Sequence, residues 1–194
     1  CVTSIEYVSP TVPVPNLTTS PPPVLLRRLL SKKFIHSVRD SYTELKLKSL
    51  GIKNVINTGC PTTWKLSEDH CKQIPRDKSD SVVFTITDYN PDVKSDGFLI
   101  DSLKKSYKNI YFWPQGAGDL KYLKRFDTNK IKILSQSLEG FDLLLKSKED
   151  IEYIGTRLHA GIRALSFKRK SLIIGIDNRS KEISKDINLP MIDR

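Results

Sequence analysis

The sequence predicts an α/β fold in which a parallel sheet carries helices on both faces. Short apolar segments alternate with amphipathic helical segments through most of the chain, and this alternation is typical of parallel strands joined by right-handed crossovers. Residues 81–87 are apolar at consecutive positions, as in a central strand that is covered on both faces. With 194 residues the chain can form one substantial core, or one domain and part of another.

The first 23 residues are predicted to lie outside the α/β domain. Prolines recur from Pro10 to Pro23, and proline cannot propagate a helix or a central strand. We therefore expect residues 1–23 to be a linker or the remnant of a preceding domain, and residues 24–194 to form a Rossmann-like domain. Because the chain starts with Cys1 and has no signal-peptide pattern, we also expect it to begin inside a longer protein.

The first half of the predicted domain begins with a short apolar helix at 24–30. A strand at 34–38 follows, and Arg39 and Asp40 then open a helix that Gly51 ends, as a glycine beyond a helix C-terminus commonly does. The remaining elements of this half are predicted as a strand at 54–57, a small helix at 67–73 and the central strand at 81–87.

The second half repeats the alternation without an internal sequence repeat. Its predicted helices are 92–107, 119–126, 138–146, 157–167 and a short one after Arg179. Its predicted strands are 109–113, 130–134, 152–154 and 172–176. In the helix at 157–167, Leu158, Ile162 and Leu165 form one apolar face, while His159 and Arg163 lie four residues apart on another.

Composition restricts the partners and the compartment. The net charge of +10 would attract phosphates, anionic glycans, nucleic acid or a membrane surface. The basic residues are scattered in short groups near helix ends, so we expect no nucleic acid partner. No apolar run approaches the roughly 20 residues of a membrane span, which leaves peripheral membrane association as the compatible mode.

The cysteines are few and odd in number, which fits a reduced compartment, and we expect a cytoplasmic protein. Cys60, His70 and Cys71 lack a fourth ligand and a paired Cys-x-x-Cys spacing. The sequence therefore predicts no structural metal.

The turn at 154–162 is the main candidate site. Thr156 has the chemistry of an N-cap, so Arg157 and His159 should fall in the first helical turn, where unpaired N–H groups and the helix dipole favour an anion. Two other interpretations stay open, in which Arg157 is a solvated surface charge and His159 is a satisfied polar side chain.

Ligands of parallel sheets gather at the carboxyl ends of the strands. The unusual residues at those predicted ends are Arg39, residues 60–64, Asp88, Gln115, Asp119, Arg157, His159, Asn178 and Arg179.

The chemistry of this set favours a phosphorylated small molecule. Arg39 and Arg157 in one crevice would suit a ligand with two anionic groups, because guanidinium pairs bidentately with carboxylate and phosphate. His159 beside them can move a proton near neutral pH. The glycine-rich signatures for dinucleotides and nucleoside triphosphates are absent, as is the G-x-S-x-G elbow, and Gly116-Ala-Gly118 is too short to count.

Two segments resemble the motifs of a known family. The stretch Gly155-Thr-Arg157-Leu-His159-Ala-Gly-Ile162, followed by an apolar strand and Asp177, resembles the R-x-H signature of the polysaccharide pyruvyl transferases. Val38-Arg39-Asp40 resembles that family's Arg-Asp motif.

The resemblance covers residues 34–194 and implies two Rossmann-like domains in a GT-B-like arrangement. The chain lacks the glycine-rich G-N-x-G-D motif of the family's N-terminal domain, so it is similar to the C-terminal, donor-binding half only.

The resemblance also implies an enzyme of polysaccharide biosynthesis, exopolysaccharides included. It would transfer the pyruvyl group of phosphoenolpyruvate to two hydroxyls of a sugar, or of a lipid-linked oligosaccharide, as a ketal with release of phosphate. No cofactor is implied, since phosphoenolpyruvate is the donor substrate. Arg39 and Arg157 would hold the carboxylate and the phosphate, and His159 would protonate the enol carbon or stabilise the cationic intermediate. Gln115, Asp119 and Arg179 are further substrate-binding candidates at strand ends.

Two other functions stay open at this point. One keeps the GT-B-like half but takes a nucleotide sugar as donor. The other is a basic, non-catalytic module for glycan or nucleic acid, which rests on the net charge alone. The aromatics argue against base stacking, because Tyr111, Phe112 and Trp113 lie in a predicted strand and are expected to pack in the core.

Overall fold

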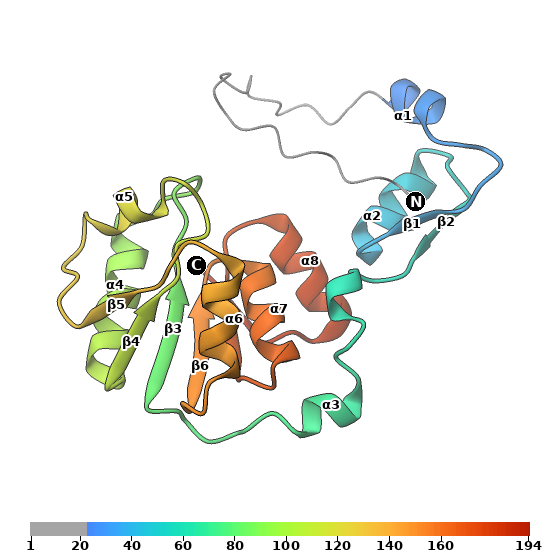
Figure 1. Cartoon of the computed structure of the whole chain (residues 1–194). Helices are drawn as coiled ribbons and strands as arrows, with labels where there is room; N and C mark the ends of the chain where they lie inside the picture. Colours follow the sequence, from blue (N-terminus) through green and yellow to red (C-terminus); the bar gives the residue numbers. More distant parts are fainter. Residues whose placement is uncertain (1–22) are drawn as a thin grey trace.

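A six-stranded, all-parallel sheet forms the centre of the structure, in the order β5-β4-β3-β6-β7-β8 (Figure 1). The computed structural model describes residues 23–194. The predicted proline-rich linker lies outside the described residues, apart from Pro23, which begins helix α1. The predicted α/β class with a Rossmann-like parallel sheet is confirmed.

The strands of this sheet are short and in parallel register. They are β3 (Ser81–Thr85), β4 (Asn109–Phe112), β5 (Ile131–Ile133), β6 (Ile151–Gly155), β7 (Ser171–Gly175) and β8 (Met191–Asp193). Every residue of β3 is buried, and β3 pairs with β4 on one side and with β6 on the other. The apolar run that predicted a central strand therefore identified β3 correctly.

Helices cover both faces of the sheet. Helices α4 (Val93–Ser106) and α5 (Asp119–Leu123) cover one face, and α6 (Leu138–Lys146), α7 (Leu158–Ser166) and α8 (Asn178–Ile187) cover the other. This division follows from right-handed crossovers, since strands are added in one direction from β3 to β5 and in the opposite direction from β6 to β8.

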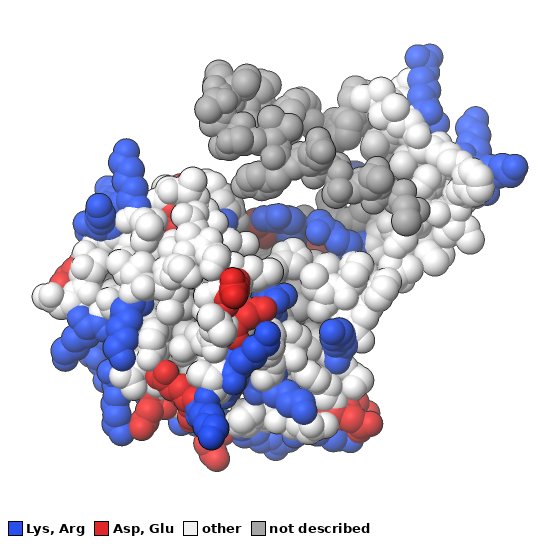
Figure 2. Space-filling view, viewed as in Figure 1, with Lys and Arg blue, Asp and Glu red and all other residues white. Residues whose placement is uncertain are grey.

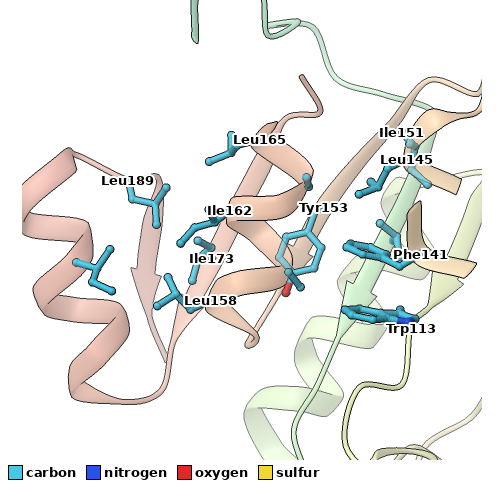
Figure 3. Close-up of a cluster of buried hydrophobic side chains, with 14 of the residues drawn as sticks. Trp113, Phe141, Leu145, Ile151, Tyr153, Leu158, Ile162, Leu165, Ile173 and Leu189 are labelled. Atoms are coloured by element: carbon cyan, nitrogen blue, oxygen red, sulfur yellow. The ribbon is translucent and has the colours of Figure 1, made fainter. Parts of the chain in front are cut away.

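The alternation of side chains along β3 creates two cores. Val82 and Phe84 point to the α4 and α5 face, whereas Val83 packs in the cluster under α6 and α7. In this second cluster the rings of Trp113 and Phe141 stack with their centroids 4.2 Å apart (Figure 3). Phe112 and Trp113 are buried as expected, although β4 ends at Phe112, and Tyr111 is half-buried.

The N-terminal strands do not join this sheet. Strands β1 (His36–Val38) and β2 (Val55–Asn57) pair with each other in a separate two-stranded parallel sheet, next to α1 (Pro23–Leu29) and α2 (Ser41–Ser49). The expectation that their ends belong to the same layer as β3 was wrong, because β1 and β2 hydrogen-bond to each other and not to a strand of the large sheet.

The small sheet is tied to the large one through α8. The carboxylate of Asp186 accepts hydrogen bonds from the backbone N–H of Ser41 at 2.7 Å and from Nδ2 of Asn57 at 2.9 Å. The connection from β2 to β3 contains the short helices η1 (Pro61–Thr63) and α3 (Glu68–Lys72). Between Pro23 and Arg194, none of the helices is both long enough and apolar enough to cross a bilayer. On the face shown in Figure 2, the Lys and Arg side chains are scattered over the surface and do not form a single stripe.

Candidate functional site

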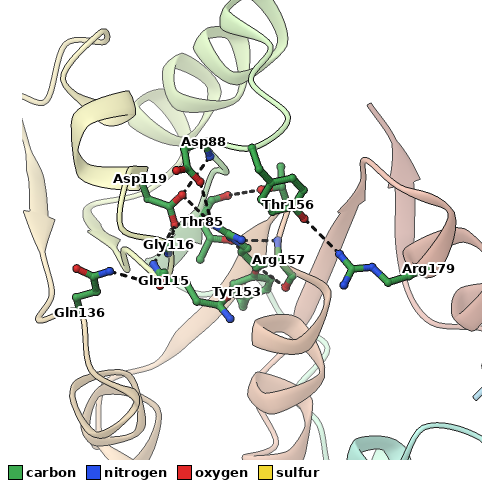
Figure 4. A network of polar contacts seen from close by, with 11 residues as sticks. Thr85, Asp88, Gln115, Gly116, Asp119, Gln136, Tyr153, Thr156, Arg157 and Arg179 are labelled. Carbon is green, nitrogen blue, oxygen red and sulfur yellow. Dashed lines mark hydrogen bonds and ion pairs between the residues drawn. The ribbon is translucent and has the colours of Figure 1, made fainter. Parts of the chain in front are cut away.

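The candidate site lies at the carboxyl ends of β3 and β6, where the strand order reverses its direction. In open α/β sheets the crevice at such a reversal is the usual ligand position. Asp88 follows β3, Arg157 follows β6, and the loop from Gln115 to Gly118 follows β4, so polar groups from three segments converge there (Figure 4).

Buried hydrogen bonds fix the backbone of Arg157 between these strands. The hydroxyl of Tyr153 donates to the carbonyl of Arg157 at 2.9 Å and lies 2.6 Å from Oγ1 of Thr85. The same Thr85 oxygen accepts the N–H of Arg157 at 3.3 Å. Because Tyr153 and Thr85 have no exposed surface, the position of this turn is set by the core.

Thr156 is not the N-cap that the sequence predicted. It is buried directly after the last residue of β6, with its N–H donating to the carbonyl of Thr85 at 3.1 Å. Helix α7 begins at Leu158, and Arg157 is the cap residue, without a side-chain capping hydrogen bond. The first N–H groups of α7 are therefore not satisfied by a cap side chain and can bind an anion.

The side chain of Arg157 is held by a buried carboxylate. Its Nη2 lies 2.7 Å from Oδ1 and 2.8 Å from Oδ2 of Asp119, which has no exposed surface. Only 12% of the Arg157 side chain is exposed, and within residues 23–194 its buried Nε has no hydrogen-bond partner. Arg157 is thus not a solvated surface charge, which removes one of the alternatives left by the sequence.

Asp119 is saturated by protein groups. Besides Arg157, its oxygens accept the backbone N–H groups of Asp88 at 3.1 Å, Gln115 at 3.0 Å and Gly116 at 2.6 Å. Such a carboxylate orients its partners and has little capacity left for a ligand. The sequence placed Asp119 at a strand end but could not show that it holds Arg157.

Tyr89 connects the two arginines of this edge, and the sequence gave it no role. The guanidinium carbon of Arg157 lies 4.9 Å from the centre of the Tyr89 ring. The Tyr89 hydroxyl lies 3.5 Å from Nη2 of Arg179, which also pairs with Asp177 at 2.7 Å. Its position in the sequence could have indicated a role at the site, because Tyr89 directly follows Asp88 at the end of the central strand.

His159 is half-buried in the first turn of α7, with its Nε2 3.7 Å from Sγ of the buried Cys60. Burial lowers the pKa of the imidazole, and the charges of Arg39 and Arg179 lower it further, while Asp177 opposes them. Arg39 comes from the end of β1 in the other sheet, so two cations act on His159 from two separate elements.

A comparison with protein families gave a match to this chain. The family model described as polysaccharide pyruvyl transferase matches residues 14–178, which is most of the chain. The chain belongs to the polysaccharide pyruvyl transferase family. A search of curated proteins and a search of solved structures gave no significant match.

In this pyruvyl transferase family member, a hollow of about 320 Å³ opens beside His159. It is lined by residues of η1, α6, α7 and the loop after β4, among them Lys65, Trp113, Gln115, Leu138 and Arg163. His159 and Arg163 both reach it, as their spacing of four residues predicted. The main chain of Gln115 is engaged with Asp119 and Gln136, which leaves the Gln115 side chain to line the hollow.

The structure gathers the predicted residues into two connected groups. Arg157 and Asp119 form a buried pair above β3 and β6, and Arg39 and Arg179 act on His159 at the start of α7. Within the described part of the chain, no three His, Cys, Asp or Glu side chains are grouped as ligands of a metal ion. His70 instead contacts the carbonyl of Leu165, with its Nε2 at 2.8 Å.

Proposed function

We propose that this family member transfers the pyruvyl group of phosphoenolpyruvate to two hydroxyls of a sugar or lipid-linked oligosaccharide, forming a ketal and releasing phosphate. The observation that supports it most is the start of α7, where His159 lies in the first helical turn under the influence of Arg39 and Arg179. Cations and unpaired N–H groups around a titratable histidine suit an anionic donor.

Phosphoenolpyruvate carries a carboxylate and a phosphate, and the site offers donors for both. Arg179 and Arg39 are exposed and can reorient toward a ligand, whereas Arg157 is held in place by Asp119. In this proposal the first-turn N–H groups of α7 and the two exposed arginines bind the phosphate. Arg157 presents its remaining N–H groups to the carboxylate.

His159 acts as the acid in this proposal. In the free chain its lowered pKa keeps the imidazole neutral near pH 7. A bound trianion would raise that pKa, so that the imidazole takes up a proton when the donor binds. The protonated ring then gives its proton to the methylene carbon of phosphoenolpyruvate. This step turns the methylene into a methyl group and makes the neighbouring carbon electrophilic toward a sugar hydroxyl.

Calorimetry with phosphoenolpyruvate tests the donor site. We expect saturable binding to the wild type and weaker binding to Arg39→Ala and Arg179→Ala, by about tenfold or more if each removes a charge-assisted hydrogen bond. Both side chains are exposed, so these variants should keep their fold. Arg76→Ala is the matched control, because Arg76 is an exposed arginine that precedes β3 at the opposite end of the sheet.

No binding of phosphoenolpyruvate to a folded wild type would reject the proposal. Stabilisation by a nucleoside diphosphate, with none by phosphoenolpyruvate, would favour a nucleotide-sugar donor instead. Identification of the ketal by mass spectrometry, after incubation with phosphoenolpyruvate and methyl hexopyranosides, would test the reaction itself.

A further inference from the structure

Two carboxylates flank the guanidinium of Arg157, and they differ in how they are held. Asp119 is fully buried and accepts several N–H groups. The Asp88 side chain is 36% exposed, and its Oδ1 lies 3.6 Å from Nη2 of Arg157. Within residues 23–194 this is the only ion pair of Asp88, so its carboxylate keeps capacity for a further partner on its open side.

The loop after β4 is shaped around the Asp88 carboxylate. A methyl group added at Gly118 would overlap the Asp88 side chain, and one added at Gly116 would lie 2.6 Å from Nη2 of Arg157. These glycines let the backbone approach the carboxylate and the guanidinium closely. The loop therefore confines the Asp88 carboxylate on one side, while part of the side chain stays exposed to solvent.

The surroundings of Asp88 also favour proton transfer. Burial raises the pKa of its carboxyl group, and the neighbouring carboxylate of Asp119 raises it further, while the charge of Arg157 opposes both. These are the charged groups that face Asp88 from α5 and from the start of α7. A carboxylate with a raised pKa is a stronger base than an ordinary surface aspartate.

We propose that Asp88 is the general base of this site, the group that takes the proton from the attacking sugar hydroxyl. The inference rests on the proposed pyruvyl transfer. It gives the site two proton-transfer groups with different tasks, His159 toward the methylene carbon and Asp88 toward the hydroxyl. Asp119 acts as a positioning residue, because it accepts the backbone N–H of Asp88 and holds the guanidinium of Arg157.

The step balances without a further reactant. As the hydroxyl oxygen bonds to the electrophilic carbon, its O–H bond breaks and the proton passes to Asp88. Asp88 returns this proton to the bridging oxygen as the bond between that oxygen and the former enol carbon breaks, so that hydrogen phosphate leaves with the bridging oxygen. The second hydroxyl then attacks the same carbon and gives its proton to Asp88, from which solvent carries it to His159. One hydroxyl proton thus ends on phosphate. The other restores to His159 the proton that it gave to the new methyl group.

Asp88→Asn separates this role from binding and folding. The amide keeps the size of the side chain but cannot accept the proton. We expect phosphoenolpyruvate to bind with an affinity close to that of the wild type, while phosphate release in the presence of methyl hexopyranosides slows by about 10²–10⁴-fold. Asp101→Asn, an exposed aspartate on α4, is the matched control and should retain full activity.

Two further measurements exclude a merely structural role. The rate of the wild type should fall at acid pH as Asp88 becomes protonated, and this acid limb should be absent from the residual activity of Asp88→Asn. Formate added to Asp88→Ala should restore part of the rate, because a small carboxylate can replace the missing base.

The outcomes distinguish this inference from the proposed function. An Asp88→Asn variant that turns over like the wild type would overturn the role of Asp88 and leave the pyruvyl transfer standing. Loss of phosphoenolpyruvate binding in that variant would also overturn it, since Asp88 would then be a binding residue. A wild type that neither binds phosphoenolpyruvate nor releases phosphate from it would remove both proposals.

Discussion

The guanidinium of Arg157 lies 2.7 Å from a carboxylate oxygen of Asp119 that has no contact with solvent. This pair joins the start of α7 to the start of α5 and so connects the helices of the two faces of the sheet. It also orders the backbone of the loop after β4, through the N–H groups of Gln115 and Gly116. This buried ion pair therefore holds the Arg157 side chain and the loop after β4 in place, in addition to the hydrogen bonds that fix the Arg157 backbone.

Asp119→Ala should destabilise the protein strongly. The substitution leaves Arg157 and several backbone N–H groups without an acceptor, and breaking a buried ion pair costs about 3–5 kcal/mol. We expect this loss in the free energy of unfolding measured by urea denaturation. Asp80→Ala is the control, because Asp80 forms an exposed pair with Lys108 and its loss should cost about 0–1 kcal/mol. Equal stabilities of the two variants would show that the buried pair contributes nothing.

His159 should titrate below its ordinary pKa of 6.5 in the free chain, because burial and the charges of Arg39 and Arg179 disfavour the imidazolium. NMR of the ring protons measures this directly, and addition of phosphoenolpyruvate should raise the pKa. Arg39→Gln should raise it without ligand. An unshifted titration curve in the free wild type would contradict the electrostatic description of the site.

The same shift has a consequence for stability. Between the pKa of folded His159 and 6.5, the unfolded chain binds more protons than the folded one, so the stability of the wild type should decrease as the pH falls through this window. His159→Gln should lack this component. A comparison of the two proteins by urea denaturation at pH 7.5 and pH 5.5 isolates it, and identical pH dependence would argue against a lowered pKa.

Gly161 allows α7 to lie close to β7. An added methyl group would come within 2.6 Å of Cγ1 of Ile173, so we expect Gly161→Ala to lower the free energy of unfolding by about 1–3 kcal/mol. Gly97→Ala in α4 is the matched control. Its new methyl group would meet only Phe126 at 3.6 Å, and alanine should stabilise the helix by roughly 0.5–1 kcal/mol. Thermal denaturation should therefore shift in opposite directions, and a shift in the same direction would refute the close packing.

The pair between Asp142 and Arg163 should stabilise the protein at neutral pH and lose this effect in acid. Both guanidinium contacts are short, 2.5 and 2.6 Å, and the hydrogen bond from Arg163 lowers the pKa of Asp142, although burial opposes it. The stabilisation is present above the ordinary pKa of 3.8 and is lost as the pH falls through the lowered value. Because Arg163 is partly exposed, Asp142→Asn should cost only about 1 kcal/mol at pH 7. The difference from the wild type should shrink below pH 3.8, and a difference that grows there would contradict the pair.

The large sheet could be predicted from local sequence pattern. The apolar run of β3 and the alternation of strands and helices gave the class, and most element bounds agree within a few residues. In α7 the spacing of Leu158, Ile162 and Leu165 correctly predicted the buried face. These features depend on residues that are close together in the sequence, so a single sequence is enough to predict them.

The features that escaped prediction depend on contacts between distant segments. Strand β8 was missed, because its three residues carry little pattern of their own. Thr156 was predicted as a cap, but its backbone N–H bonds to Thr85 and it is buried between β6 and α7. The pairing of Asp119 with Arg157 joins residues 38 positions apart, and no local pattern indicates it. The candidate residues were thus identifiable by type and position, but their partners were not.

The pairing of β3 with β6 has a consequence for how the protein folds. The contact between Thr85 and Arg157 spans 72 positions of the chain, so the loop that must close before the site exists is long. Pairing of β3 with β4 and of β6 with β7 involves shorter loops and can occur first, as two separate nuclei. We expect the junction between these nuclei to form late, and chains delayed at that stage to expose the apolar edges of the two central strands to aggregation.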